Sequence, residues 1–165
     1  MARNTSAVST WIPATRISKS NHFAFEHVMA SSLQVLHVRE GEGSDTARLG
    51  PYEIETLIPV ADEGAATAYR VRIGPNQRTS TSYHKLAEEL YLVLAGSGIA
   101  VLDGVEHALR TGDFLRLPPG TTHAFVTGED ALVMLDVHTP GSRPDRDVYF
   151  VGETPQGFSV PSPVT

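Results

Sequence analysis

The chain has 165 residues, with 19 acidic and 13 basic side chains and a formal net charge of −6 at neutral pH. This acidic balance argues against nucleic acid or an anionic membrane surface as a partner, because both need clustered cations. The chain contains no cysteine, which excludes disulfides, thiolate metal ligands and cysteine nucleophiles. Its length is typical of one domain that buries roughly 70% of the surface its unfolded chain exposes.

The first part of the chain is polar and rich in Ser and Thr. It lacks the apolar segment of a secretory signal, and the chain nowhere contains a run of about 18 apolar residues. We therefore expect a soluble, cytoplasmic protein. Residues 1–33 are predicted to form an N-terminal extension that is either mobile alone or ordered by packing on a neighbour. Within it, the pattern from residue 21 onward fits both a strand and a short helix, so both alternatives stay open.

From Gly50 onward, short runs of β-branched and aromatic residues alternate with Gly, Pro, Asn and Asp. Strands that recur every 8 to 12 residues or so predict an antiparallel sandwich or barrel, here over residues 34–152. The predicted strands are 52–60, 66–73, 90–94, 98–102, 105–109, 114–117, 123–126, 132–137 and 148–151.

Two glycine-containing pairs predict turns between these strands. Asp103-Gly104 predicts a type I′ hairpin, because that turn needs a positive φ at both central residues. Gly96-Ser97 predicts a break between the runs 90–94 and 98–102. After the last strand, three prolines exclude a helix from residues 153–165. This C-terminal tail is predicted to wrap the surface or to reach a partner subunit.

Histidine and carboxylate side chains occur among the central strands. Ser82 and His84 are two apart and point to the same side of a strand. Glu89 begins the next strand, and His123 follows a turn far along the chain. A small closed sheet can bring His84, Glu89 and His123 together. Two imidazoles and one carboxylate suit Fe(II), which we favour, and also accept Mn, Ni or Zn.

Two segments resemble the two motifs of the cupin family. Glu89 is followed by six residues and Gly96, with His84 at the position of the second histidine of the first motif. The second segment runs from Gly112 through Pro118-Pro119-Gly120 to His123, with the family's spacing throughout. The resemblance implies an all-β, antiparallel jelly-roll barrel, commonly dimeric, with a metal inside the barrel mouth. It also implies His84, Glu89 and His123 as metal ligands.

Ser82 departs from this pattern, because it stands where the family's first motif has another histidine. A neutral hydroxyl is a poor ligand beside imidazole or carboxylate. Two alternatives follow. The site is either a three-ligand metal centre with more room for substrate, or a cavity that works without metal. In both cases Ser82 is a candidate substrate-binding residue.

The three-ligand arrangement is also similar to that of 3-hydroxyanthranilate dioxygenases. Gly74-Pro75-Asn76-Gln77-Arg78 and Tyr83-His84 resemble two sequence elements of that family. Two extra residues separate these elements, and Thr127 stands where that family has a substrate-binding arginine. The resemblance therefore implies the metal triad and makes Arg78 a candidate anchor for an anionic substrate. It does not carry over the substrate.

Alternation along the strands supplies further candidates. If Glu89 and His123 point inward, Tyr91 and Phe125 point inward as well. Tyr91 is a candidate acid, or a core residue whose hydroxyl finds a partner. Phe125 is a candidate substrate contact. His138 ends a late strand and is a candidate general base, or a simple loop histidine.

These observations favour a metal-dependent enzyme of the dioxygenase, isomerase or cyclase type, acting on a small oxygenated substrate that can be anionic. Two alternatives remain open. One is a binding module for a sugar-like ligand. The other is a metal-free epimerase, which needs a histidine paired with a carboxylate, and no partner aspartate is evident from the sequence.

The outward positions of the strand after Glu89 bear on assembly. Leu90, Leu92 and Leu94 should face away from the cavity. Three aligned leucines are costly in water. We therefore predict a homodimer, with these leucines covered by the second subunit or by one of the chain's own ends.

Overall fold

The computed structural model describes residue 33 and residues 35–158, so the predicted N-terminal extension lies almost wholly outside the described residues. Strands are the main regular structure of the described chain, which also contains one short 3₁₀ turn, η1 (Val60–Asp62). The described residues include no helix that is long and apolar enough to cross a bilayer. The strands are β1 (Thr46–Leu49), β2 (Tyr52–Thr56), β3 (Thr67–Ile73), β4 (Ser82–Tyr83), β5 (Glu88–Leu102), β6 (Val105–Arg110), β7 (Phe114–Leu117), β8 (His123–Val126), β9 (Leu132–Thr139) and β10 (Tyr149–Phe150).

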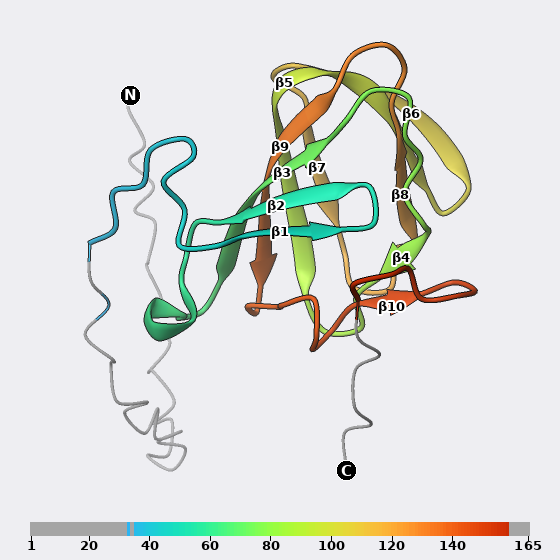
Figure 1. Cartoon of the computed structure of the whole chain (residues 1–165). Coiled ribbons are helices and arrows are strands. Elements are labelled where there is room, and N and C mark those ends of the chain that lie inside the picture. The colour runs from blue at the N-terminus through green and yellow to red at the C-terminus, as the bar shows by residue number, and fades with distance from the viewer. Residues whose placement is uncertain (1–32, 34, 159–165) are drawn as a thin grey trace, which may run out of the picture. The chain divides into compact units, whose positions relative to one another are not determined.

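These strands form one curled antiparallel sheet, in the order β1-β2-β3-β9-β5-β8-β4-β10, with β6 and β7 also paired to β5 (Figure 1). Strand β5 belongs to both halves of the barrel. Its first part pairs with β7 and β9, and its last part pairs with β6 and β8. The predicted all-β jelly-roll barrel is confirmed.

The predicted break at Gly96-Ser97 is wrong, because β5 continues through both residues as one strand of 15 residues. Its pairing with β9 shifts by one residue between Val93 and Ala95. Gly96 has a φ of +81°, and a Cβ there would lie 1.7 Å from the carbonyl oxygen of Ala131. Glycine is therefore needed here for a bulge and a close backbone approach, a role that sequence alone does not distinguish from a turn.

The other predicted turn, the hairpin between β5 and β6, is confirmed. Asp103 and Gly104 have φ values of +47° and +82°, as a type I′ turn requires. Strand β1 was not among the predicted strands, and Ser82 was expected on a strand without bounds being given for it. Strand β4 has only two residues, and its place in the sheet depends on one pairing with β8 and two with β10 rather than on a local pattern.

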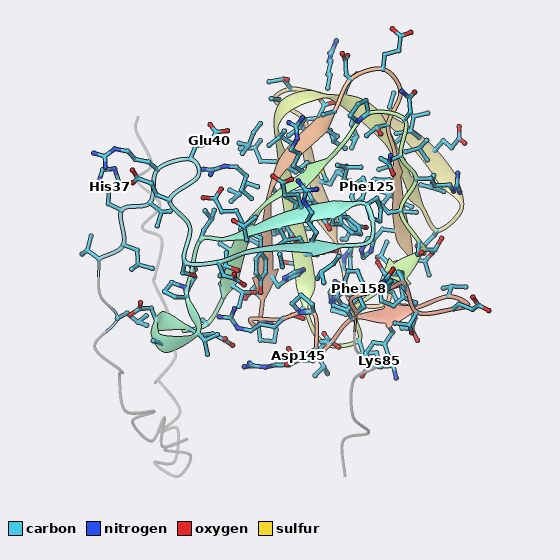
Figure 2. All side chains as sticks on the ribbon, in the orientation of Figure 1. His37, Glu40, Lys85, Phe125, Asp145 and Phe158 are labelled. Carbon is cyan, nitrogen blue, oxygen red and sulfur yellow. The ribbon has the colours of Figure 1, made fainter. Side chains whose placement is uncertain are left out.

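Inward residues of the two halves form the core, as alternation predicts. Strand β3 buries Tyr69, Val71 and Ile73 and turns Arg70 and Arg72 outward. Phe125 is fully buried, and Figure 2 shows it between the strands of the barrel. The core cluster comprises Tyr69, Val71, Ile73, Tyr91, Val93, Ala100, Leu109, Leu117, Phe125, Leu132 and Met134.

The segment that follows β9 is hydrogen-bonded to the start of β3 and to the residue directly after η1. The carbonyl oxygen of Ser142 accepts hydrogen bonds from Thr67 and Tyr69, at 2.7 and 2.9 Å. Arg143 donates to the Glu63 carboxylate at 2.5 Å. Burial raises the pKa of Glu63, but the hydrogen bond and charge of Arg143 outweigh it and hold that pKa below its ordinary value.

Substitution of Gly96 by alanine should lower the free energy of unfolding by more than about 2 kcal/mol, because the new methyl group meets the Ala131 carbonyl at a positive φ. Gly104→Ala is the matched control. It has nearly the same φ but open space around it, and should cost only about 1 kcal/mol. Urea denaturation measures both. Equal losses would show that backbone conformation alone decides the effect.

Arg143→Met should lower the free energy of unfolding by about 1 to 2 kcal/mol at pH 7, because Glu63 loses a charged donor. The folded-state pKa of Glu63 is depressed, so this stabilisation is present above its unfolded pKa, near 4.3. The difference between the variant and wild type should shrink as the pH falls through the folded pKa. Arg116→Met, which breaks the exposed pair with Glu88, should cost only a few tenths of a kcal/mol.

Candidate functional site

A cavity of about 60 Å³ lies among the inward faces of strands β2 to β5, β8 and β9, and of the C-terminal segment. Burial is greatest at its polar floor, where every side chain is at most 6% exposed. The polar lining residues that carry chemistry are Ser82, His84, Glu89, Tyr91, His123 and His138.

Backbone pairing brings these residues together from distant parts of the chain. Glu89 is opposite His138 of β9, and Ser82 is opposite His123 of β8. His84 directly follows β4, and its carbonyl oxygen accepts a hydrogen bond from the Gly120 amide at 2.6 Å. Glu89 is therefore at the start of the strand that both halves of the barrel share.

Three imidazoles surround the Glu89 carboxylate, which is 3% exposed. The Nε2 atoms of His84 and His138 lie 3.3 and 2.8 Å from Oε1, and Nε2 of His123 lies 3.3 Å from Oε2. Tyr91 donates its hydroxyl hydrogen to Oε1 at 2.6 Å. The inward positions expected for Tyr91 and Glu89 are confirmed.

Charge and burial act in opposite directions on this carboxylate. Burial raises the pKa of Glu89, but the charge on His123 and hydrogen bonds from His138 and His84 hold it well below its ordinary value. Burial lowers the pKa of His123 and favours its neutral form. Burial also raises the pKa of Tyr91, which keeps its hydroxyl a donor.

The tautomer of His123 follows from its neighbours. Its Nδ1 lies 3.2 Å from the carbonyl oxygen of Thr121. A carbonyl can only accept, so Nδ1 carries the hydrogen and the neutral ring has a lone pair at Nε2. That lone pair faces Glu89 Oε2, which is buried and accepts no hydrogen bond from the described residues. Two acceptor atoms 3.3 Å apart in a buried site fit a shared cation.

Two sets of three residues are able to hold a cation, and both contain His84 and Glu89. The sequence predicts His123 as the third ligand. The most compact set instead contains His138, with ligand atoms of all three residues within 4.8 Å of one another. The site thus offers three imidazole nitrogens and one carboxylate, a donor set that suits Fe, Mn, Ni or Zn.

His138 is buried rather than in a surface loop. It shares the inner face of β9 with Asp136, two residues earlier on the strand. The Oδ1 atom of Asp136 lies 3.6 Å from Nε2 of His138. Burial lowers the pKa of His138, but Asp136 and Glu89 outweigh this effect and raise it to about 9. Burial raises the pKa of Asp136 to about 7.

Asp136 is the functional candidate that the sequence reasoning missed. No partner aspartate was evident from the sequence, but the structure supplies one, because Asp136 and His138 share the inner face of β9. Strand alternation at Leu132, Met134, Asp136 and His138 is the signal that would have found it. A charged residue at a buried position of such a row indicates a site rather than core packing.

The remaining predicted site residues lie in different surroundings. The hydroxyl of Ser82 is 3.1 Å from Nε2 of His123, so Ser82 is beside a candidate ligand in the cavity wall. Phe125 packs edge-on against Tyr91, with ring centroids 5.2 Å apart, behind the cavity rather than along its wall. Arg78 is exposed and does not line the cavity.

The fold and the site define a class of protein. Residues 69–138 match the family model for the cupin domain, a span that contains all the candidate ligands. Over these residues the chain is similar to cupin domains, and its fold is that of the small cupins.

Known proteins with similar sequences or structures include bacterial ones. Protein SchB of Streptomyces halstedii is 29% identical over 114 residues, which cover 68% of this chain and 83% of SchB. The dimethylsulfoniopropionate lyase DddW of Ruegeria pomeroyi is 39% identical over 59 residues, 36% of this chain and 38% of that protein. A Streptomyces PAC13 variant solved with uridine has a TM-score of 0.59 at 20% identity, covering 71% of this chain and 89% of that one. At that identity the structural likeness shows the fold alone.

Proposed function

We propose that this cupin is a metal-dependent enzyme for a small oxygenated molecule, with a divalent ion held by His84, Glu89 and His123. The observation that carries the proposal is the unprotonated Nε2 of His123 facing the unpartnered Oε2 of Glu89. Without a cation, Nε2 of His123 has the Ser82 hydroxyl within reach at 3.1 Å, whereas the buried Oε2 of Glu89 has no donor among the described residues, which costs free energy. When bound, such an ion supplies Lewis acidity toward a substrate oxygen or, as Fe(II), activates dioxygen.

The surrounding residues support proton transfer beside that centre. His138 lines the cavity, and its Nε2 lies within reach of both Glu89 and Asp136. An imidazole held between two carboxylates is stabilised in its charged form, so His138 is a strong base toward a substrate carbon once it has given up its own proton. Tyr91 orients Glu89 through its hydrogen bond. The apolar remainder of the wall keeps water away from the reacting groups.

Among the reaction types that the sequence leaves open, we favour elimination or isomerisation over dioxygenation. Both begin when a base removes a proton from carbon. In an elimination, the electron pair of that C–H bond forms a double bond while the leaving group departs with its own pair. The support comes from relatives whose names state such reactions, a lyase and the nucleoside dehydratase Pac13. Cyclase chemistry remains compatible with the same base.

A second candidate function is a metal-free epimerase or dehydratase. The pairing of Asp136 with His138 favours it, because this reaction needs a histidine base supported by a carboxylate. Tyr52 and Tyr69 also line the cavity and are able to supply a hydroxyl on another side. In this alternative, Glu89 and the three imidazoles form a charged hydrogen-bond network instead of a metal centre. A sugar-like binding module would use the same cavity without turnover.

Metal analysis distinguishes these candidates. Protein purified without added metal should contain about one divalent ion per chain by plasma mass spectrometry. His84→Ala, Glu89→Gln and His123→Ala should each reduce the bound ion at least tenfold, because each removes a ligand. His138→Ala should retain most of the ion while losing turnover. His107→Ala, on the exposed face of β6, is the control and should change neither quantity.

Other outcomes would contradict parts of the proposal. Loss of the ion in His138→Ala, with retention in His123→Ala, would select the compact set of ligands instead. Protein that contains no ion and takes up neither Fe(II), Mn nor Zn would favour the metal-free function.

We further propose a homodimer that covers the outer face of β5. Leu92 and Leu94 are 37% and 40% exposed, and Phe114, opposite Leu92 on β7, is 60% exposed. These side chains form one apolar strip on the outer face of the antiparallel sheet. A second copy would remove this strip from water at both subunits.

Leu92→Asp should shift the protein toward monomer, with a dissociation constant raised at least tenfold, because it places a charge within the covered strip. Light scattering after size-exclusion chromatography at micromolar concentration measures the mass. Val105→Asp, at an apolar position on β6 that is 58% exposed, should leave the dimer intact. A wild-type monomer under these conditions would refute the dimer.

A further inference from the structure

The cavity is divided into a polar floor and an apolar mouth. The floor carries the ring nitrogens and the carboxylate described above. The mouth is lined by apolar and aromatic side chains from β2, from β10 and from the segment around them. The mouth residues are Tyr52, Ile54, Pro144, Val148, Phe150 and Phe158.

Three of these rings form a cluster that we call the aromatic mouth, consisting of Tyr52, Phe150 and Phe158. Phe150 and Phe158 meet edge to face with ring centroids 4.9 Å apart, and Phe158 meets Tyr52 at 6.3 Å. Aromatic rings such as these pack favourably against another flat ring, either stacked with an offset or edge to face. Lys85 and Phe158 lie toward the end of the barrel where β4 and β10 run (Figure 2).

The aromatic mouth is fastened to the floor by Asp147. Its buried carboxylate accepts the backbone N–H groups of Lys85, Leu86 and Ala87, at 3.0, 3.0 and 2.8 Å. These three residues join His84 to Glu89. Because the same carboxylate holds both segments, the C-terminal residues up to β10 are a built part of the cavity wall.

The cavity wall contains no Lys or Arg side chain from the described part of the chain. The nearest cations along the sequence are engaged elsewhere. The ammonium of Lys85 lies 3.9 Å above the Tyr149 ring, and Arg143 is paired with Glu63. A carboxylate, sulfonate or phosphate at the mouth would lose its hydration and gain no counter-charge.

We propose that the substrate is a molecule with a flat, uncharged ring at one end and a hydroxyl or carbonyl oxygen at the other. The ring is held in the aromatic mouth, and the oxygen points to the floor. This inference deepens the proposed function, since it rests on the cavity being a small-molecule site, and it narrows the substrate to ring-bearing molecules. A substrate with an uncharged ring end also gives Arg78 no role as the anchor of an anionic group.

Three probes that share one fused two-ring carbon skeleton test the proposal. Their binding to the protein as purified is measured by isothermal titration calorimetry. 2-Naphthol carries a flat ring and one hydroxyl, decahydro-2-naphthol has the same hydroxyl without flatness, and 6-hydroxynaphthalene-2-sulfonate adds a charge at the far end. We expect saturable binding of 2-naphthol, about threefold weaker binding of the saturated probe, and at least tenfold weaker binding of the sulfonate.

Variants of the aromatic mouth should affect the same measurement. Phe150→Ala and Phe158→Ala should each weaken 2-naphthol binding about tenfold, and Phe158→Leu about threefold, because leucine keeps the apolar volume but not the ring. The leucine variant also serves if an alanine variant fails to fold, which circular dichroism checks. Val151→Ala, next to Phe150 but 59% exposed, should bind as wild type does.

Three results would overturn the proposal: no saturable binding of 2-naphthol, equal affinity for the sulfonate, or an equal loss in Val151→Ala and Phe158→Ala. Binding does not require turnover, so it is separable from the proposed enzyme. If the predicted pattern occurs in protein that holds no metal, the ring-binding mouth stands and the metal-dependent function falls. If metal is present and no probe binds, the metal-dependent function stands and the ring-binding mouth falls.

Discussion

The carboxylate of Glu89 is the group on which the rest of this site depends. It is buried, it accepts a hydrogen bond from Tyr91, and three imidazole nitrogens lie within 3.3 Å of its oxygens. A buried carboxylate is tolerated only when positive or hydrogen-bonding groups compensate for its lost hydration. The residues on or next to β4, β5, β8 and β9 that surround this carboxylate therefore share one role, which is to compensate for its lost hydration.

The bend of β5 is what makes this convergence possible. The first part of the strand carries Glu89 and Tyr91 beside β9, and the part after Gly96 pairs with β8, which carries His123. Gly96 links a local backbone feature to the geometry of the site, because only a residue without a Cβ fits against Ala131.

The chain after β9 completes the cavity and sets its character. Ser142 and Arg143 fasten this segment near β3 and η1, and Asp147 fastens it to the loop between His84 and Glu89. Its aromatic side chains line the entrance of the cavity, so that an apolar entrance leads to a polar floor. The two ends of the cavity differ in polarity, so a bound molecule is expected to have one orientation.

The sequence by itself determined the barrel class, most strand positions, the Asp103-Gly104 hairpin and the inward faces of Glu89 and Tyr91, because alternation and turn chemistry are local. It did not determine the continuity of β5 through Gly96, the burial of His138, its pairing with Asp136, or the exposure of Arg78 outside the cavity. These features depend on which strands pair and in which register. Only the tertiary structure decided them, because sheet closure joins residues that no local pattern connects.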